Sequence, residues 1–136
     1  MKGYGLPFSC FFLLLAAVIT LACGSSPHML QAVTVSPQIA DANGSPVQFT
    51  ATGYYTTPPS PVTPLTATWG ACNLDGSVTS AVSVGSTGLA QCAAGSVGTY
   101  MVWAFGTNPS RGVCNAINAC GGGCGRITGI ANLTCP

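Results

Sequence analysis

The sequence predicts an all-β domain that is crosslinked by disulfide bonds, and three observations lead to this expectation. Residues 98–106 place β-branched and aromatic side chains between glycines, a composition that favours a strand. Residues 47–52 alternate strictly between apolar and polar side chains, which is typical of a strand with one buried face. Beyond residue 23 the chain has six cysteines, an even number that suits three bridges in an exported domain.

The first 22 residues have the pattern of an export signal. Lys2 supplies a positive start, and the apolar run that follows ends at Ala22 and is too short to span a bilayer comfortably. We therefore expect a signal peptide, as a helix, at 1–22, then a short tether at 23–29, which contains the single histidine, His28, and one domain at 30–136.

The junction Leu21-Ala22-Cys23-Gly24 resembles the end of a bacterial lipoprotein signal, in which the cysteine receives lipid and becomes the new N-terminus. The resemblance implies lipid attachment at Cys23. It makes the membrane a partner through this anchor, and it places the protein in the cell envelope, at the outer or plasma membrane. Thr20 and Ala22 also fit the small-x-small rule of ordinary signal cleavage, so a secreted protein is the alternative.

The domain itself is expected to consist of short strands separated by turns. Asn43-Gly44 and Asp75-Gly76 are turn signals, and the four prolines of 56–64 predict a stiff extended connection. Residues 107–125 form an insert rich in cysteine and glycine that has little apolar surface to bury, so only crosslinks are expected to order it. The expected strands cover 30–37, 47–52, 65–69, 78–84, 88–92, 98–106 and 126–134.

The strand at 98–106 is the one around which the others are expected to pack. Successive side chains of a strand point to opposite faces, so Tyr100, Val102 and Ala104 share one side. We call the other side the apolar stripe, and it consists of Met101, Trp103 and Phe105. Both faces of this strand are apolar, and we expect both to be covered.

The order of these elements resembles that of the bacterial Ig-like (Big) domains of cell-surface proteins. The resemblance implies a β-sandwich of about seven strands with Greek-key connections. This sequence departs from the family pattern in its proline connection, its cysteines, its 107–125 insert and its apolar stripe, where small polar residues are expected. The segments that carry the resemblance are Val33-Thr34-Val35-Ser36-Pro37, Val47-Gln48-Phe49-Thr50-Ala51, Ala67-Thr68-Trp69, Ser86-Thr87-Gly88-Leu89-Ala90, Ala94-Gly95 to Tyr100 and Ile127 to Leu133.

The composition argues against catalysis and against nucleic-acid binding. The chain is only 4% charged, with two aspartates, no glutamate and one histidine, so a paired acid and base are not available. Beyond the signal the charges sum to zero, which gives no basic footprint for nucleic acid. We therefore expect no enzyme activity, no cofactor and no metal.

The six cysteines are expected to form structural disulfides, with any of 15 connectivities open. Zinc ligation by four of them is the weaker interpretation, because the spacings do not match paired Cys-x2–4-Cys knuckles and an exported chain favours oxidation. The disulfide candidates are Cys72, Cys92, Cys114, Cys120, Cys124 and Cys135.

The sequence thus indicates a non-enzymatic envelope lipoprotein with one Ig-like domain, a structural or interaction module whose protein partner is not identified. The alternative is a secreted or surface module that recognises a glycan or peptide through the apolar stripe, because exposed aromatic side chains mark recognition sites. We expect, however, that the 107–125 insert folds over the stripe as a lid, which would leave no surface there for a ligand.

Overall fold

The computed structural model describes residues 26–107, 120 and 126–136, and within these ranges the chain is all-β, with no helix. The expected signal helix at 1–22 and the lipid site at Cys23 lie outside them. The strands are β1 (Leu30–Ser36), β2 (Ile39–Asp41), β3 (Val47–Gln48), β4 (Thr50–Tyr55), β5 (Thr68–Asn73), β6 (Val82–Val84), β7 (Leu89–Cys92), β8 (Gly98–Thr107) and β9 (Arg126–Cys135).

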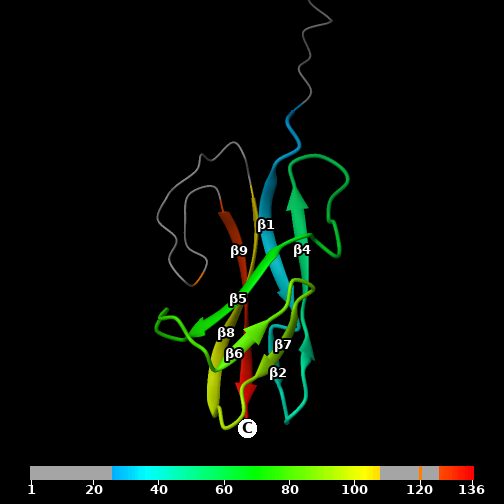
Figure 1. The fold of residues 1–136 in the computed structure, drawn as a ribbon. Coiled ribbons are helices and arrows are strands. Elements are labelled where there is room, and N and C mark those ends of the chain that lie inside the picture. Colours follow the sequence, from blue (N-terminus) through cyan, green and yellow to red (C-terminus); the bar gives the residue numbers. More distant parts are fainter. Residues whose placement is uncertain (1–25, 108–119, 121–125) are drawn as a thin grey trace, which may run out of the picture.

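The strands form the two layers of an Ig-like β-sandwich (Figure 1). One layer is the sheet β2-β9-β8-β5, in which β2 is parallel to β9 and the other neighbours are antiparallel. The other layer contains the pairs β1-β4 and β3-β7-β6, which are continuous because only Phe49 separates β3 from β4. In the first layer, the last strand of the domain, β9, thus pairs with β2, which lies near the start of the domain.

The core lies between the two layers and follows the predicted alternation. Val102 and Ala104 of β8 are fully buried in it, and Tyr100 packs against it at its edge. The long strand β9 alternates in the same way, burying every second residue from Ile127 to Cys135. The largest fully buried side chains of this core are Phe49, Leu133, Val35 and Val102.

Three of the predicted strands need correction, and one strand, β2, was not predicted. The predicted strand at 47–52 is split at Phe49, whose N–H donates to the carbonyl of Gly88 (2.9 Å) instead of to a regular ladder, and it continues to Tyr55. Strand β2 was not predicted, because three residues offer no periodic signal. After β1 ends at Ser36, the Gln38 carbonyl accepts a hydrogen bond from the Asn132 N–H (2.8 Å), so the chain leaves β4 and joins β9.

Strand β5 also differs from the expectation for 65–69. Leu65 precedes the strand, and its N–H donates to the Ala51 carbonyl (2.8 Å). The strand therefore begins at Thr68 and includes Cys72, which was expected to follow its end. The predicted strand at 78–84 is likewise shorter and begins at Val82.

The sandwich has two distinct ends, which we name the tether end and the far end. At the tether end Leu30 pairs with Tyr55, and Thr107 pairs with Arg126. The side chain of Leu30 lies against Gly106, which brings these two pairs together. At the far end Gly98 pairs with Cys135 (Figure 1, bottom, where the C-terminus is marked).

The tether is fastened to the tether end by Thr56. The Thr56 hydroxyl donates to the carbonyl of Pro27 (2.6 Å) and accepts a hydrogen bond from the N–H of Met29 (3.0 Å). The Thr56 N–H donates to the carbonyl of Met29 (3.0 Å). His28, between them, is exposed and stacks on Tyr55, with 4.2 Å between the ring centroids. Residues 27–29 are therefore an extension of the sandwich.

The proline connection at 56–64 folds back onto β4 instead of running extended to the next strand. Val62 and Gly53 exchange two backbone hydrogen bonds, of 2.8 and 3.0 Å. The Ser60 hydroxyl accepts a further bond from the Tyr55 N–H (2.9 Å). Pro58, Pro59 and Pro61 are exposed, so this loop presents its rings to solvent.

Candidate functional site

The apolar stripe lies on the outer face of the sheet β5-β8-β9, as its alternation with the core residues requires. Strand pairing sets its neighbours. Trp103 lies between Gly70 of β5 and Ile130 of β9, and Phe105 lies between Thr68 and Thr128. The face therefore collects large side chains on β8 and smaller ones on the two flanking strands.

The indole of Trp103 lies directly over Gly70. A Cβ atom at position 70 would overlap the ring, with the indole Cε2 only 2.6 Å away. The same indole stacks on Phe105, with 5.2 Å between ring centroids and 14° between the planes. Beyond Phe105, the guanidinium carbon of Arg126 lies 4.2 Å from the ring centroid, a cation–π contact. Trp103, Phe105 and Arg126 thus form one continuous stack along the sheet.

The stripe is only partly open to solvent. Phe105 is 8% exposed, and Met101 and Trp103 are half-buried. The Nε1 atom of Trp103 is buried and has no hydrogen-bond partner among the described residues. The most open apolar side chain of this face is Ile130, at 49%. A recognition surface made of three exposed side chains is therefore not what the structure presents, because Phe105 is closed off.

One of the two disulfides among the described residues closes this face. Cys72 pairs with Met101 across the sheet, so its side chain points outward, yet it is fully buried and lies outside the core cluster. Its bond to Cys120 explains how an outward side chain is covered. The Cys120 sulfur also lies 2.9 Å from the Gly76 carbonyl oxygen. The lid expected from 107–125 falls, except for Thr107 and Cys120, outside the described residues.

The second disulfide joins the two layers. It connects Cys92 at the end of β7 with Cys135 at the end of β9, which belong to different sheets. Two of the three expected bridges are therefore present among six candidates. The remaining candidates, Cys114 and Cys124, lie outside the described residues.

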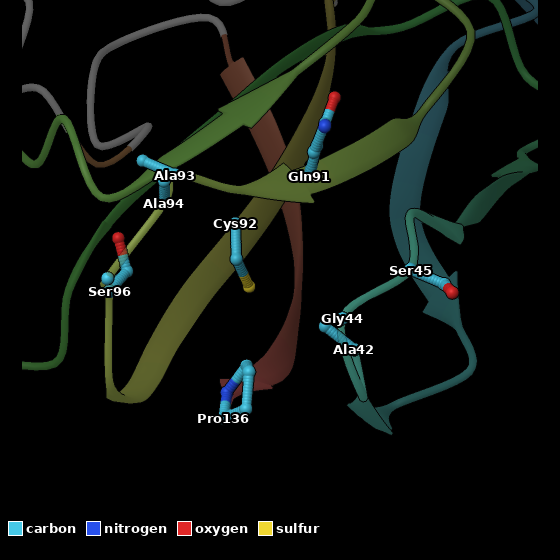
Figure 2. Close-up of a pocket in the computed structure, with 10 residues that line it drawn as sticks. Ala42, Gly44, Ser45, Gln91, Cys92, Ala93, Ala94, Ser96 and Pro136 are labelled. Carbon is cyan, nitrogen blue, oxygen red and sulfur yellow. The ribbon is translucent and has the colours of Figure 1, made fainter.

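A hollow of about 300 Å³ lies at the far end, beside Cys92 (Figure 2). Its walls come from the turn after β2, from the segment that links β7 to β8, and from the end of β9. Ser45, Gln91 and Ser96 supply its polar side chains, and no titratable side chain lines it. Its polar side chains offer hydrogen-bonding groups to a small neutral molecule.

The described residues contain few charged side chains, and the pKa of one of them, Asp75, is shifted. Asp75 accepts hydrogen bonds from the hydroxyl and then the N–H of Ser77 (2.6 and 2.9 Å), and these lower the pKa of its carboxyl below the ordinary value. This carboxylate is exposed and belongs to the predicted Asp-Gly turn. Within 26–107, 120 and 126–136, no three His, Cys, Asp or Glu side chains are grouped so that they could hold a metal ion. The same ranges contain no helix long and apolar enough to cross a bilayer.

Sequence reasoning missed two residues of the outer face, Gly70 and Arg126. An isolated glycine within a strand often marks a close approach, and Gly70 carried that signal. Arg126 was recognised only as the start of the last strand. Its place over Phe105 depends on the pairing of Thr107 with Arg126, which the sequence does not specify.

We expect Gly70→Ala to destabilise the domain by about 1–3 kcal/mol, because the added methyl group displaces the indole of Trp103 from a packed position. Urea unfolding followed by tryptophan fluorescence measures this. Gly85→Ala is the matched control, since its added Cβ would meet nothing closer than 3.7 Å. Equal stability of the two variants would contradict the placement of the indole over position 70.

No protein-family model matches the chain, and no curated protein sequence matches it either.

Proposed function

We propose that this chain is a non-enzymatic lipoprotein of the bacterial cell envelope, with one Ig-like domain that serves as a structural or interaction module. The proposal includes membership of the bacterial Ig-like (Big) domains. The order of the motifs in the sequence supports that membership.

The fastening of the tether is the observation that carries the proposal. Pro27 and Met29 are hydrogen-bonded to Thr56, so the ordered domain begins only four residues after Cys23. Four residues span at most about 14 Å when fully extended. A lipid on Cys23 would therefore hold the tether end close to the membrane, whereas a longer connection would have allowed the domain to move away. Such a short connection suits a module with a fixed position.

The small number of acidic and basic side chains supports a binding or structural role over an enzymatic one. The chain has one histidine and two aspartates. His28 is exposed on the tether, and both Asp41 and Asp75 are exposed near the far end. No pair of these groups is placed at the outer face or in the hollow beside Cys92, so neither site has the acid and base that hydrolysis or transfer requires.

Metabolic labelling with an alkyne fatty acid in a bacterial host tests the proposal. We expect the wild-type chain to carry the label and Cys23→Ala to carry none, because the thiol of Cys23 is the acceptor. Intact-mass analysis of membrane-extracted protein should show an N-terminal Cys23 with its acyl chains. An unmodified N-terminus at Cys23 or Gly24 would contradict the proposal and favour the secreted alternative.

The second candidate function is glycan or peptide recognition at the apolar stripe. The unpartnered indole Nε1 of Trp103 and the exposed side chain of Ile130 favour it, since together they offer a donor beside an apolar contact. The burial of Phe105 weakens it, because only part of the stripe can touch a ligand. We therefore place it second.

A further inference from the structure

The charged side chains of the described residues are divided between the two ends of the sandwich. Asp41 pairs with Thr134, one residue before the far-end pair Gly98–Cys135. Asp75 is the second residue after β5, whose last residue, Asn73, pairs with Tyr100 in the half of the sandwich nearer the far end. Arg126, the basic side chain of this part of the chain, lies at the tether end. Among the described residues, both carboxylates therefore lie away from the tether end, and the guanidinium of Arg126 lies over Phe105 on the outer face.

The tether end also exposes the side chains that are favoured at the interface between water and lipid. Tyr54 is 41% exposed, and Tyr55 stacks on His28 beside it. The neighbouring proline loop adds exposed Pro58, Pro59 and Pro61. Tyrosine is enriched at the headgroup level of membranes, because its ring is apolar and its hydroxyl can stay hydrated.

The length of chain before the domain limits how far this surface can be from a bilayer. Cys23 is four residues from Pro27, which Thr56 holds against the end of β4. The span of about 14 Å is less than the thickness of a single domain. An acylated Cys23 therefore keeps Tyr54 and the proline loop within contact range of the headgroups.

From these observations we propose that the tether end rests directly against the lipid headgroups, with the exposed side chain of Tyr54 and the proline loop in contact. This inference rests on the proposed lipid anchor and adds a membrane-contact surface to it. The anchor supplies the affinity for the membrane, and the surface fixes the orientation of the sandwich. Because the strands run from the tether end to the far end, the sheet that carries Trp103 is then roughly perpendicular to the membrane plane (Figure 1).

Photo-crosslinking of the acylated, full mature chain in vesicles of phosphatidylethanolamine and phosphatidylglycerol tests the inference. A benzophenone amino acid replaces Tyr54 in one variant and Val97 in the other. Val97 is the matched control, since it is 70% exposed and adjoins Gly98 at the far end. We expect at least about tenfold more lipid adduct from position 54 than from position 97.

Two results would overturn the inference. Equal or negligible lipid adducts at both positions would mean that the end does not rest on the membrane. A crosslinked dimer from position 54, in place of lipid adducts, would mean that a second copy of the chain occupies this surface. Intact mass of the same samples reports acylation at Cys23, so a failure of the anchor is distinguished from a failure of the contact.

Discussion

Replacing Cys92 and Cys135 together by alanine is expected to lower the free energy of unfolding by about 4 kcal/mol. The two cysteines are 43 residues apart and join the two sheets, so their bond restricts the unfolded chain across much of the domain. The chain-entropy relation gives about 4 kcal/mol for a closed loop of this length. Guanidinium unfolding measured under non-reducing conditions checks the value, and we expect the melting temperature to fall by on the order of 15 °C.

The other bridge provides the control for this experiment. Cys72 and Cys120 are 48 residues apart, so their replacement by alanine removes nearly the same entropy from the unfolded chain. Any difference between the two double variants then reports what each bridge does in the folded state. A change of less than about 1 kcal/mol for Cys92 and Cys135 would contradict a stabilising role for the inter-sheet bond.

Phe49→Ala is expected to cost about 3–5 kcal/mol. The side chain is fully buried at the point where β3 passes into β4, and its removal leaves a cavity between the layers. The backbone at this position also holds Gly88 through its N–H, so the surroundings cannot collapse freely into the space. Urea unfolding followed by circular dichroism measures the loss.

Phe49→Leu separates the cavity from the loss of hydrophobic character. Leucine preserves most of the buried volume, so we expect a cost of about 1–1.5 kcal/mol. If alanine and leucine at position 49 were equally stable, Phe49 would not be a central packing residue, and the continuity of the second layer across this position would be in question.

The sequence was sufficient to predict most of the strands and the buried faces of the longer ones. Residues 47–52 and 126–134 are long enough to show a period of two, and their burial follows it. Strand β2 escaped prediction because it exists only through its pairing with β9. The proline loop was misjudged for a similar reason, since Val62 returns to Gly53 by a contact between segments that local sequence does not encode.

The candidate site was predictable only in part. That Met101, Trp103 and Phe105 share a face follows from alternation alone. The register of β8 with its neighbours decides that Trp103 lies over Gly70 and Arg126 over Phe105. Many registers satisfy the same apolar pattern, so the sequence does not determine these contacts. The disulfide pairs were equally open, because six cysteines allow 15 connectivities and only the fold brings Cys92 close to Cys135.

The proline loop has a consequence for how closely copies of this domain can be crowded together. Strand β7 covers the side of β3 but not that of β4, which leaves a row of backbone groups that would accept a strand from another molecule. Val62 fills part of that row, and the prolines around it have no N–H with which to continue a ladder. The free edge of β4 is thereby blocked, so a strand from a neighbouring molecule cannot extend the sheet there.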